Sequence, residues 1–249
     1  MPKTSELNPP RIIVEGVRKT YTLRHTQSFK ETFVAWIRRK KTSTSFQALN
    51  GIDITVGDSE AIALLGYNGS GKSTLLKLVS GVLRPDAGRI LTRGRVAGLI
   101  EVGAGFHPDL SGRENVYLNA AILGMSKDEI DARFDEIVEF SEIGEFIDTE
   151  VKHYSSGMFV RLAFSVAIHT ELDILLVDEV LAVGDAPFRE KCKTKIREIV
   201  AAGKTLFIVS HDLGMVSDLC SRGIVLRRGE MVFDGAIGDA ITTLKASTR

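Results

Sequence analysis

The sequence predicts an α/β fold in which a mostly parallel central sheet carries helices on both faces. Two apolar runs, residues 174–177 and 205–209, are short, continuous and flanked by helical patterns, as expected of strands buried on both faces. A third apolar run ends at Leu65 and passes into a glycine-rich turn, and another helical pattern follows that turn. Because the buried strands alternate with helices, we expect crossover connections and a parallel sheet.

Length and composition limit the possible classes. The chain has 249 residues, 44% of them hydrophobic and 26% charged, and its formal net charge is zero. These values are ordinary for a folded soluble protein, and a neutral chain offers no overall attraction for nucleic acid. The first residues contain no apolar core of a secretory signal, and no apolar run approaches the roughly 20 residues of a membrane helix. We therefore expect that the chain does not span a membrane.

The remaining elements follow from periodicity and from glycine and capping signals. A short strand is expected over residues 12–17, and strand material over residues 46–65 and 89–100, the latter broken at Gly94 and Gly98. Helical segments are expected over residues 73–83, 111–148, 156–169 and 188–202. The charged segment 111–148 contains two capping-box patterns, Ser111-x-x-Glu114 and Ser126-x-x-Glu129. We expect it to be a helical insertion in the α/β core.

The glycine-rich turn predicts a phosphate-binding loop. Its sequence, Gly66-Tyr-Asn-Gly-Ser-Gly-Lys72-Ser73, fits the pattern G-x-x-x-x-G-K-[ST]. Glycines let the backbone wrap tightly, so that successive N–H groups and the next helix N-terminus point at phosphate oxygens. We expect Lys72 to neutralise the β- and γ-phosphates of ATP and the Ser73 hydroxyl to ligate Mg²⁺. The loop residues expected to bind ATP are Gly66, Tyr67, Asn68, Gly69, Ser70, Gly71, Lys72, Ser73 and Thr74.

Polar side chains follow two other buried strands. Asp178 and Glu179 come directly after the run 174–177, and His211 comes shortly after the run 205–209. Ligands bind at the carboxyl edge of open α/β sheets, so these side chains are candidates for catalysis. Asp178 fits a place in the Mg²⁺ shell, whereas Glu179 could orient or deprotonate an attacking water. His211 is positioned to reach a γ-phosphate, although a purely structural role fits its position equally well.

Taken together, these motifs and the segment Tyr154-Ser155-Ser156-Gly157-Met158 resemble the ATP-binding subunit of an ABC transporter over nearly the whole chain. The resemblance implies a P-loop domain with a mostly parallel sheet, an antiparallel β-subdomain and a helical subdomain. It also implies that two copies sandwich two ATP molecules, each between one P-loop and the signature of the other copy. The residues that would contact ATP in trans are Ser155, Ser156, Gly157, Met158 and the D-loop residue Asp185. Tyr21 occupies the place of the adenine-stacking aromatic, and packing is its alternative role.

The resemblance divides the single domain, 1–249, into three approximate parts. These are an N-terminal β and P-loop part (11–100), a helical subdomain ending in the signature helix (101–170), and a C-terminal part with the remaining motifs (171–249).

Departures from the common family pattern point to one branch. Tyr154, Ser156 and Met158 replace three residues of the usual Leu-Ser-Gly-Gly-Gln signature. No glutamine occupies the sensor region, where Glu101 is the candidate for a contact with the metal. These variants are similar to the polysaccharide-export branch, which moves lipid-linked glycans. Some members carry a carbohydrate-binding domain after the ATPase, and since this chain ends at Arg249 we expect none here.

The same branch carries extra residues after the adenine-stacking aromatic, where this chain has an amphipathic segment at 28–41. Its Phe and Trp side chains repeat on one helical face, and a basic cluster closes it at residues 38–41. The alternatives are a core helix, a nucleic-acid arm, and a helix that contacts the bilayer surface or the membrane subunit, which we favour. Charge reversal across 38–41 should then impair transport and leave basal ATPase activity largely intact.

The sequence thus predicts an ATPase on the cytoplasmic face of the cell membrane that drives export of a lipid-linked polysaccharide. Its expected partners are ATP, Mg²⁺, a second copy of itself, two copies of a separate permease and the glycan, but no nucleic acid. A small-molecule P-loop kinase and a non-transport ABC ATPase acting on nucleic acid or ribosomes are the alternatives. The signature segment argues against the first, and the lack of a second ATPase domain or of long coiled coils argues against the other.

Overall fold

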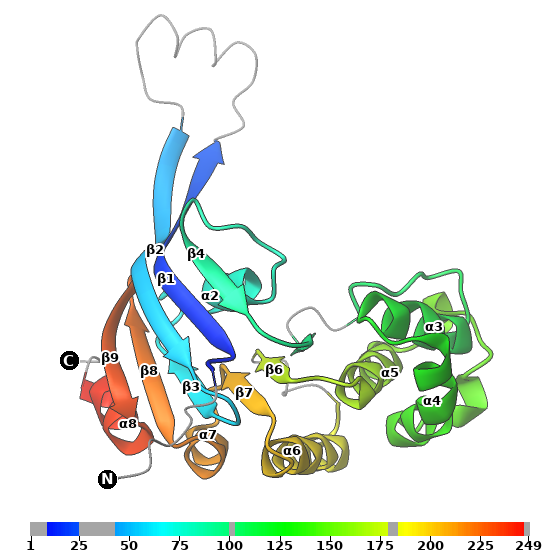
Figure 1. Cartoon of the computed structure of the whole chain (residues 1–249). Coiled ribbons are helices and arrows are strands. Elements are labelled where there is room, and N and C mark those ends of the chain that lie inside the picture. Colours follow the sequence, from blue (N-terminus) through cyan, green and yellow to red (C-terminus); the bar gives the residue numbers. More distant parts are fainter. Residues whose placement is uncertain (1–8, 25–42, 100–102, 179–183, 247–249) are drawn as a thin grey trace, which may run out of the picture.

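The computed structural model describes residues 9–24, 43–99, 103–178 and 184–246. Within these ranges the chain forms two sheets with helices around them, and a separate group of helices lies to one side (Figure 1). The amphipathic segment 28–41 and the candidate residues Glu101 and Glu179 lie outside the described residues. None of the described helices has both the length and the apolar character needed to cross a membrane.

A six-stranded sheet forms the centre of the molecule. Its strand order is β5-β6-β7-β3-β8-β9, with parallel pairing from β5 to β8 and antiparallel pairing between β8 and β9. The strands are β3 (Ala61–Leu65), β5 (Val96–Leu99), β6 (Ile174–Val177), β7 (Thr205–Ile208), β8 (Arg222–Arg227) and β9 (Glu230–Ala236). Every residue of β3, β6 and β7 is buried, which explains their continuous apolar sequences. The predicted mostly parallel sheet is confirmed.

An antiparallel sheet packs beside the first. Its order is β2-β1-β4, formed by β1 (Ile12–Arg24), β2 (Ser43–Val56) and β4 (Ala87–Thr92). The expected end of the first strand at Val17 is wrong, because β1 continues pairing with β2 as far as Arg24. The register shifts around Gly16, whose φ is 56°, so a bulge interrupts the alternation of the sequence without ending the ladder.

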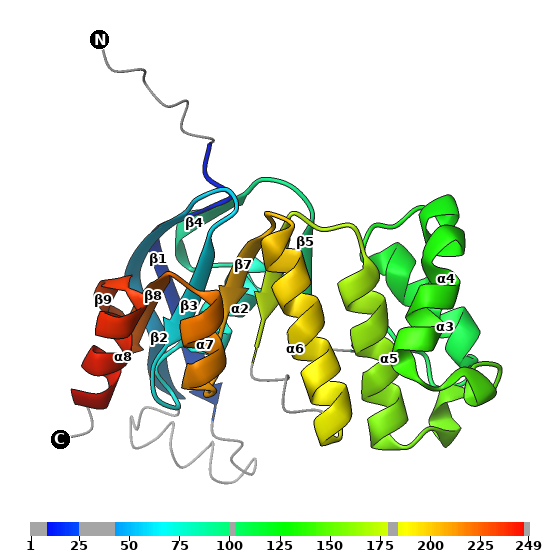
Figure 2. The same ribbon diagram turned by 90° about the horizontal axis from the view of Figure 1, so that it is seen from below.

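The two faces of the central sheet have different covers. On one face, side chains such as Leu175 and Leu206 pack against helices, which include α6 (Ala186–Ala201), α7 (Leu213–Leu219) and α8 (Ile237–Ala246). Figure 2 shows these helices side by side across that face. On the other face, side chains such as Ile62 and Phe207 pack against α2 (Lys72–Val79) and the antiparallel sheet. The central strands are therefore covered on both sides, as the sequence predicts.

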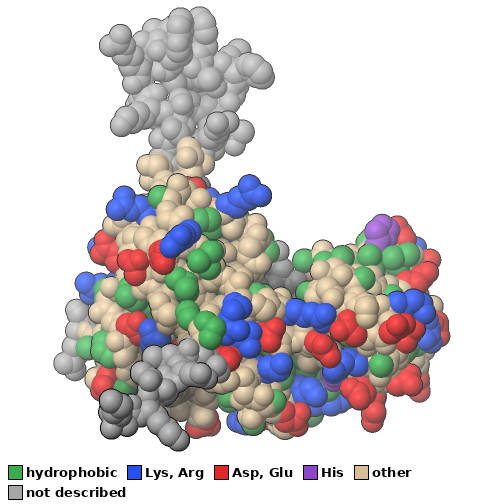
Figure 3. Space-filling model, in the orientation of Figure 1, with side chains coloured by type: hydrophobic (Ala, Val, Ile, Leu, Met, Phe, Trp, Pro, Cys, Tyr) green, Lys and Arg blue, Asp and Glu red, His purple; other side chains and the backbone are tan. Residues whose placement is uncertain are grey.

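The helical subdomain has a small core of its own. Its helices are α3 (Gly112–Ile122), α4 (Lys127–Ser141) and α5 (Ser156–His169), joined through the 3₁₀ turns η1 (Gly144–Phe146) and η2 (Val151–His153). Both predicted capping boxes are present, with Ser111 and Ser126 accepting hydrogen bonds from the backbone three residues on. Buried side chains from all three helices form the core, and acidic and basic side chains are interspersed on the surface (Figure 3).

Three further predictions about element boundaries need correction. The helix expected over 73–83 ends at Val79, before Gly81 adopts a left-handed φ of 80°. Of the two glycines expected to break the strand material after residue 89, only Gly94 does so, whereas Gly98 lies inside β5. The helix expected from residue 188 begins at Ala186, because Asp185 caps it.

Candidate nucleotide-binding site

Sheet order brings the main predicted site residues to one edge. β6, β7 and β3 are neighbours and run parallel, so their carboxyl ends lie side by side. Asp178 follows β6, His211 follows β7, and the glycine-rich loop follows β3. Segments that are more than a hundred residues apart in the sequence thus meet at one edge, which is the usual ligand-binding place of this class of sheet.

The backbone of the loop requires its glycines. Gly66, Gly69 and Gly71 have φ values of 155°, 78° and 107°. A Cβ on Gly66 would lie 2.5 Å from the Leu226 carbonyl oxygen, and one on Gly71 would lie 2.6 Å from the Ala48 carbonyl oxygen. At these two positions any side chain would collide with backbone, so the tight wrap that turns N–H groups inward needs glycine.

Two polar side chains are buried inside the loop. Lys72 is 6% exposed, and its Nζ donates to the Gly66 carbonyl at 2.8 Å and to the Tyr67 carbonyl at 3.3 Å. Ser70 is 4% exposed, and among the described residues its Oγ has no hydrogen-bond partner. Since a buried polar atom without a partner is costly, a ligand with acceptor or donor atoms in the loop would relieve Ser70.

Contacts from other strands support the loop. The Gly229 N–H donates to the Ser70 carbonyl at 3.0 Å, and the Asn50 N–H donates to the Gly229 carbonyl at 2.8 Å. Gly229 has a φ of 81°, and a Cβ there would lie 2.7 Å from the Ala48 carbonyl oxygen. Gly229 is not among the residues predicted from the sequence, although the Arg-Arg-Gly-Glu turn between two strands is a signal that could have found it.

The loop encloses a cavity of about 320 Å³, open to solvent, that is lined by residues 68–74. Ser73 is exposed at its edge. Among the described residues, no group of three or more His, Cys, Asp or Glu side chains could hold a metal ion. The Ser73 hydroxyl and the Asp178 carboxylate are oxygen donors of the kind Mg²⁺ prefers, so their chemistry fits a magnesium ion, which would need phosphate or water for its remaining ligands.

The His211 loop is anchored by its neighbour Asp212. The Asp212 carboxylate caps α7 by accepting from the Met215 N–H, and it forms a 3.1 Å ion pair with Lys193 of α6. The Met215 N–H and Lys193 lower the pKa of Asp212, so it is a carboxylate at neutral pH. His211 itself is exposed at the edge of the sheet. Its catalytic role is a prediction that its placement permits.

Tyr21 lies in the second half of β1. It pairs with Phe46 of β2, two positions before Ala48, whose carbonyl packs under Gly71. Its ring is half-buried, and Lys19 Nζ lies 6.0 Å from the ring centroid. This placement is compatible with stacking on a base, and that role remains a prediction.

The signature segment begins α5, within the helical subdomain rather than at the nucleotide loop (Figure 1). Ser155 caps the helix by accepting from the Met158 N–H, and both Ser155 and Ser156 are exposed. Gly157 has no positive φ, and among the described atoms around it a Cβ would meet only Ser155 Oγ, at 3.8 Å. Met158 packs at the edge of the helical core. The packing of the described chain therefore does not explain why residue 157 is glycine.

Asp185, the D-loop candidate, caps α6. Its Oδ1 accepts from the Phe188 N–H at 3.3 Å and from Arg161 Nη2 at 2.7 Å. Desolvation acts to raise the pKa of the Asp185 carboxyl, but these two hydrogen bonds hold the pKa below its ordinary value. Asp185 is thus a carboxylate on an exposed edge, linked to the helix that carries the signature.

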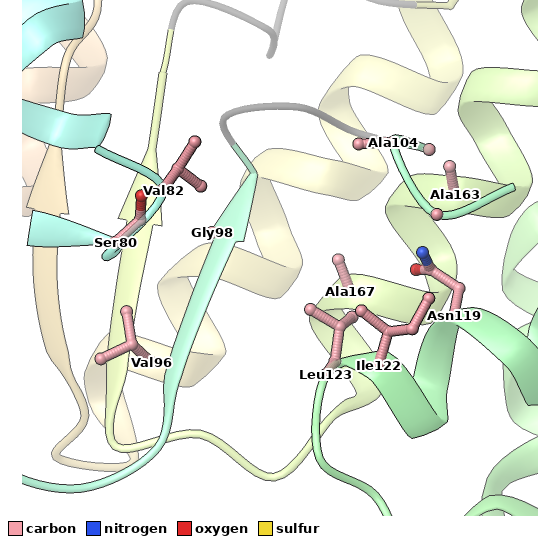
Figure 4. A pocket seen from close by; sticks show the side chains of 12 residues that line it. Ser80, Val82, Val96, Gly98, Ala104, Asn119, Ile122, Leu123, Ala163 and Ala167 are labelled. Atoms are coloured by element: carbon pink, nitrogen blue, oxygen red, sulfur yellow. The ribbon is translucent and has the colours of Figure 1, made fainter. Parts of the chain in front are cut away.

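A second hollow lies between the central sheet and the helical subdomain. It measures about 350 Å³ and is lined by residues of β5, of the loop after α2, and of α3 and α5. Figure 4 shows Val82 and Val96 on its sheet side, facing Ile122 and Leu123 on its helical side. Val82 and Ile122 are 59% and 62% exposed, so the groove has an apolar rim.

Comparisons with known proteins agree with this geometry. Residues 49–182 match the family model described as ABC transporter. The ABC transporter protein AbcA of Aeromonas salmonicida is 46% identical over 92% of this chain and 74% of AbcA. The O-antigen export system ATP-binding protein RfbB of Myxococcus xanthus is 45% identical over 88% of this chain. The teichoic acids export ATP-binding protein TagH of Listeria innocua is 41% identical over 89% of it.

These relatives differ from the chain in length. The chain spans 51% of the Myxococcus RfbB and 65% of the Listeria TagH. Among solved structures, a dimeric post-hydrolysis state of an ATP-binding cassette with bound ADP and Pi has a TM-score of 0.70 and 21% identity, covering 91% of this chain and 98% of the cassette. At 21% identity, that likeness shows the fold alone. The match of more than half the chain to the family model and the close relatives show that this chain is an ATP-binding, ATP-hydrolysing member of the ABC transporter family.

Proposed function

We propose that this chain is the motor subunit of an exporter of a lipid-linked polysaccharide and that two copies close around two ATP molecules. The observation that carries the two-copy arrangement is the signature turn, in which Ser155 and Ser156 are exposed. Gly157 costs the helix stability and serves no contact among the described residues of its own chain, as expected if a partner's nucleotide packs there. The open nucleotide loop of one copy would then be covered by the signature of the other.

Hydrolysis would proceed by in-line attack of water on the γ-phosphate. Lys72 would offset the charge of the β- and γ-phosphates, and the loop N–H groups would hold them in place. Glu179 would orient or deprotonate the water, and His211 would contact the γ-phosphate from the adjacent strand. A magnesium ion held by Ser73 and Asp178 would supply further charge neutralisation on the phosphates. A contact between Glu101 and this magnesium ion remains a prediction, because Glu101 lies outside the described residues.

The transported substrate is inferred from the relatives. Two of them are named for export of O-antigens and of teichoic acids. We propose that a separate permease, in two copies, carries the glycan, and that one of its segments docks in the apolar groove between β5 and α3. The exposed Val82 and Ile122 on opposite rims would be covered by that contact, and the chain would be held at the cytoplasmic face of the membrane.

Substitution of Glu179 tests the proposed chemistry. Glu179→Gln should retain ATP binding, reduce turnover at least a hundredfold and accumulate a nucleotide-bound dimer, because the water loses its base. Turnover and size-exclusion elution with ATP are measured beside Glu198→Gln, an exposed carboxylate of α6 that is expected to behave as the parent. Turnover at the parent rate in Glu179→Gln would remove Glu179 from its role.

Purification from native membranes tests the transport assignment. We expect a permease and its lipid-linked glycan to co-purify with the tagged chain, and Val82→Asp with Ile122→Asp to release them without loss of ATP binding. Co-purification of nucleic acid or ribosomes in place of a permease would instead identify a non-transport ATPase.

A further inference from the structure

Arg161 joins the helical subdomain to the first turn of α6. It lies on α5, five residues after Ser156, and its side chain is 18% exposed. One guanidinium nitrogen donates to Glu142 at 2.6 Å and another to Asp185 at 2.7 Å. The guanidinium carbon also lies 4.8 Å from the centroid of the Phe188 ring. Two carboxylates and an aromatic face therefore hold this one cation.

Each partner of Arg161 is itself held in place. Asp185 caps α6, and Phe188 is 1% exposed in the core of that face. Glu142 ends α4 in a left-handed conformation, with φ of 58°, and accepts from Lys191 of α6 at 3.0 Å. Lys191 also donates to the Phe140 carbonyl at 3.1 Å. The ion pairs thus connect the C-terminal end of α4 and the N-terminal half of α5, both in the helical subdomain, to the N-terminal half of α6 in the core.

The helices α5 and α6 lie side by side (Figure 2), and their first turns carry the exposed signature and Asp185. Both groups are candidates for contact with the partner's nucleotide. The capping bond from the Phe188 N–H holds Asp185 to its own helix, and Arg161 fixes the same oxygen relative to α5. A charge-assisted hydrogen bond of this length holds an exposed carboxylate more tightly than a neutral cap does.

We propose that Arg161 is a positioning residue that fixes Asp185 relative to the signature turn, so that both reach the partner copy's nucleotide as one unit. The proposal rests on the two-copy ATPase proposed above. It predicts a defect in joining two copies, and no defect in binding nucleotide to one copy, because Arg161 does not line the cavity of the nucleotide loop.

The chain contains a matched control. Arg113 of α3 also pairs with an aspartate, Asp148, at 2.8 Å, and its guanidinium carbon lies 4.8 Å from the Phe134 ring centroid. These contacts stay within the helical subdomain, and the Arg113 side chain is 47% exposed. Arg113→Ala therefore removes the same kinds of interaction without touching the connection to α6.

The test uses the full chain in the Glu179→Gln background, with Arg161→Ala, Arg161→Lys and Arg113→Ala. A fluorescent ATP analogue is titrated at protein concentrations where the chain is a monomer, and the Kd of the ATP-bound dimer is measured by sedimentation. We expect Arg161→Ala to raise the dimer Kd at least tenfold while the nucleotide Kd changes less than twofold. Arg161→Lys, which retains the cation but not the two-pronged geometry, should be intermediate, and Arg113→Ala should match the parent.

Several results would overturn the proposal. They are an unchanged dimer Kd in Arg161→Ala, an equal rise in Arg113→Ala, or a loss of nucleotide binding by the Arg161→Ala monomer. If Arg161→Ala does not fold, a folded Arg161→Lys variant that dimerises like the parent overturns it as well. If the parent itself forms no dimer with ATP, the proposed function is what fails. Turnover in the unblocked background adds a further check, since kcat should fall with little change in KM for ATP.

Discussion

The nucleotide loop and the signature turn both contain glycine, serine and a helix N-terminus, but their surroundings differ. Two glycines of the loop pack tightly against the chain itself, with the Ala48 carbonyl and the Leu226 carbonyl directly against Gly71 and Gly66. In the signature turn Ser155 and Ser156 are exposed, and among the described residues a Cβ on Gly157 would meet only the Ser155 hydroxyl oxygen, at 3.8 Å. Packing within the chain explains these two glycines of the loop, whereas no packing among the described residues explains the glycine of the signature turn. Substitutions can separate these two kinds of glycine.

Gly71→Ala should have the largest effect on the fold. The new Cβ would meet the Ala48 carbonyl oxygen at 2.6 Å in a left-handed conformation, so we expect the free energy of unfolding to fall by roughly 2–3 kcal/mol. ATP binding should be lost, since the loop must open to relieve the collision. Chemical denaturation and nucleotide titration measure both effects.

Gly81→Ala is the control for that substitution. Gly81 also has a positive φ, 80°, but a Cβ there would meet none of the described atoms within 4 Å, leaving only the backbone term of about 1 kcal/mol. Equal losses of unfolding free energy in the two variants would show that the collision with the Ala48 carbonyl does not cause the destabilisation by Gly71→Ala.

Ser111→Ala tests how much a local capping interaction stabilises the helical subdomain. The Ser111 hydroxyl caps α3, and the Glu114 carboxylate accepts from the Ser111 N–H at 2.8 Å. Loss of this cap should cost about 1 kcal/mol of unfolding free energy, whereas Ser111→Asn should recover most of it. Nucleotide binding should not change in either variant, and altered binding would mean that the two regions are coupled more tightly than their packing indicates.

Gly157→Ala should stabilise the fold slightly, whereas Gly71→Ala destabilises it. Alanine in the first turn of α5 should raise the unfolding free energy by about 0.5 kcal/mol, because nothing in the described chain opposes its methyl group. The ATP-bound dimer should nevertheless weaken at least tenfold. Gly144→Ala, in the 3₁₀ turn of the same subdomain, should leave the dimer unchanged. An unaffected dimer in Gly157→Ala would remove the argument that this glycine serves a partner.

The smallest expected effect is a change in how thermal stability depends on pH under acidic conditions. The Ser126 N–H, followed by Arg95, lowers the pKa of Glu129 from 4.5 to about 2. Because the folded-state pKa is depressed, the stabilisation is present above pH 4.5 and is lost as pH falls toward 2. Glu129→Gln should therefore flatten the fall of thermal stability between those pH values, measured by calorimetry, and an unchanged slope would contradict this attribution.

Much of the fold could be predicted because its signals are local. The strands β3, β6 and β7 appear as continuous apolar runs, and the capping boxes at Ser111 and Ser126 mark helix starts within three residues. The end of β1 could not be predicted, because pairing with β2 carries it past the bulge at Gly16. The contact between Gly229 and Ser70 could not be predicted for a similar reason, because it joins segments that lie far apart in the sequence.

By itself the sequence determined the type of chemistry, because a phosphate-binding loop needs glycines and a lysine at a fixed local spacing. It also determined which strands are buried, because burial on both faces selects apolar side chains at every position. Only the tertiary structure decided that Asp178 and His211 stand beside the loop, that Ser70 is left without a partner among the described residues, and that Arg161 reaches Asp185. These arrangements depend on strand order and on the packing of α5 against α6, and no local pattern encodes such contacts.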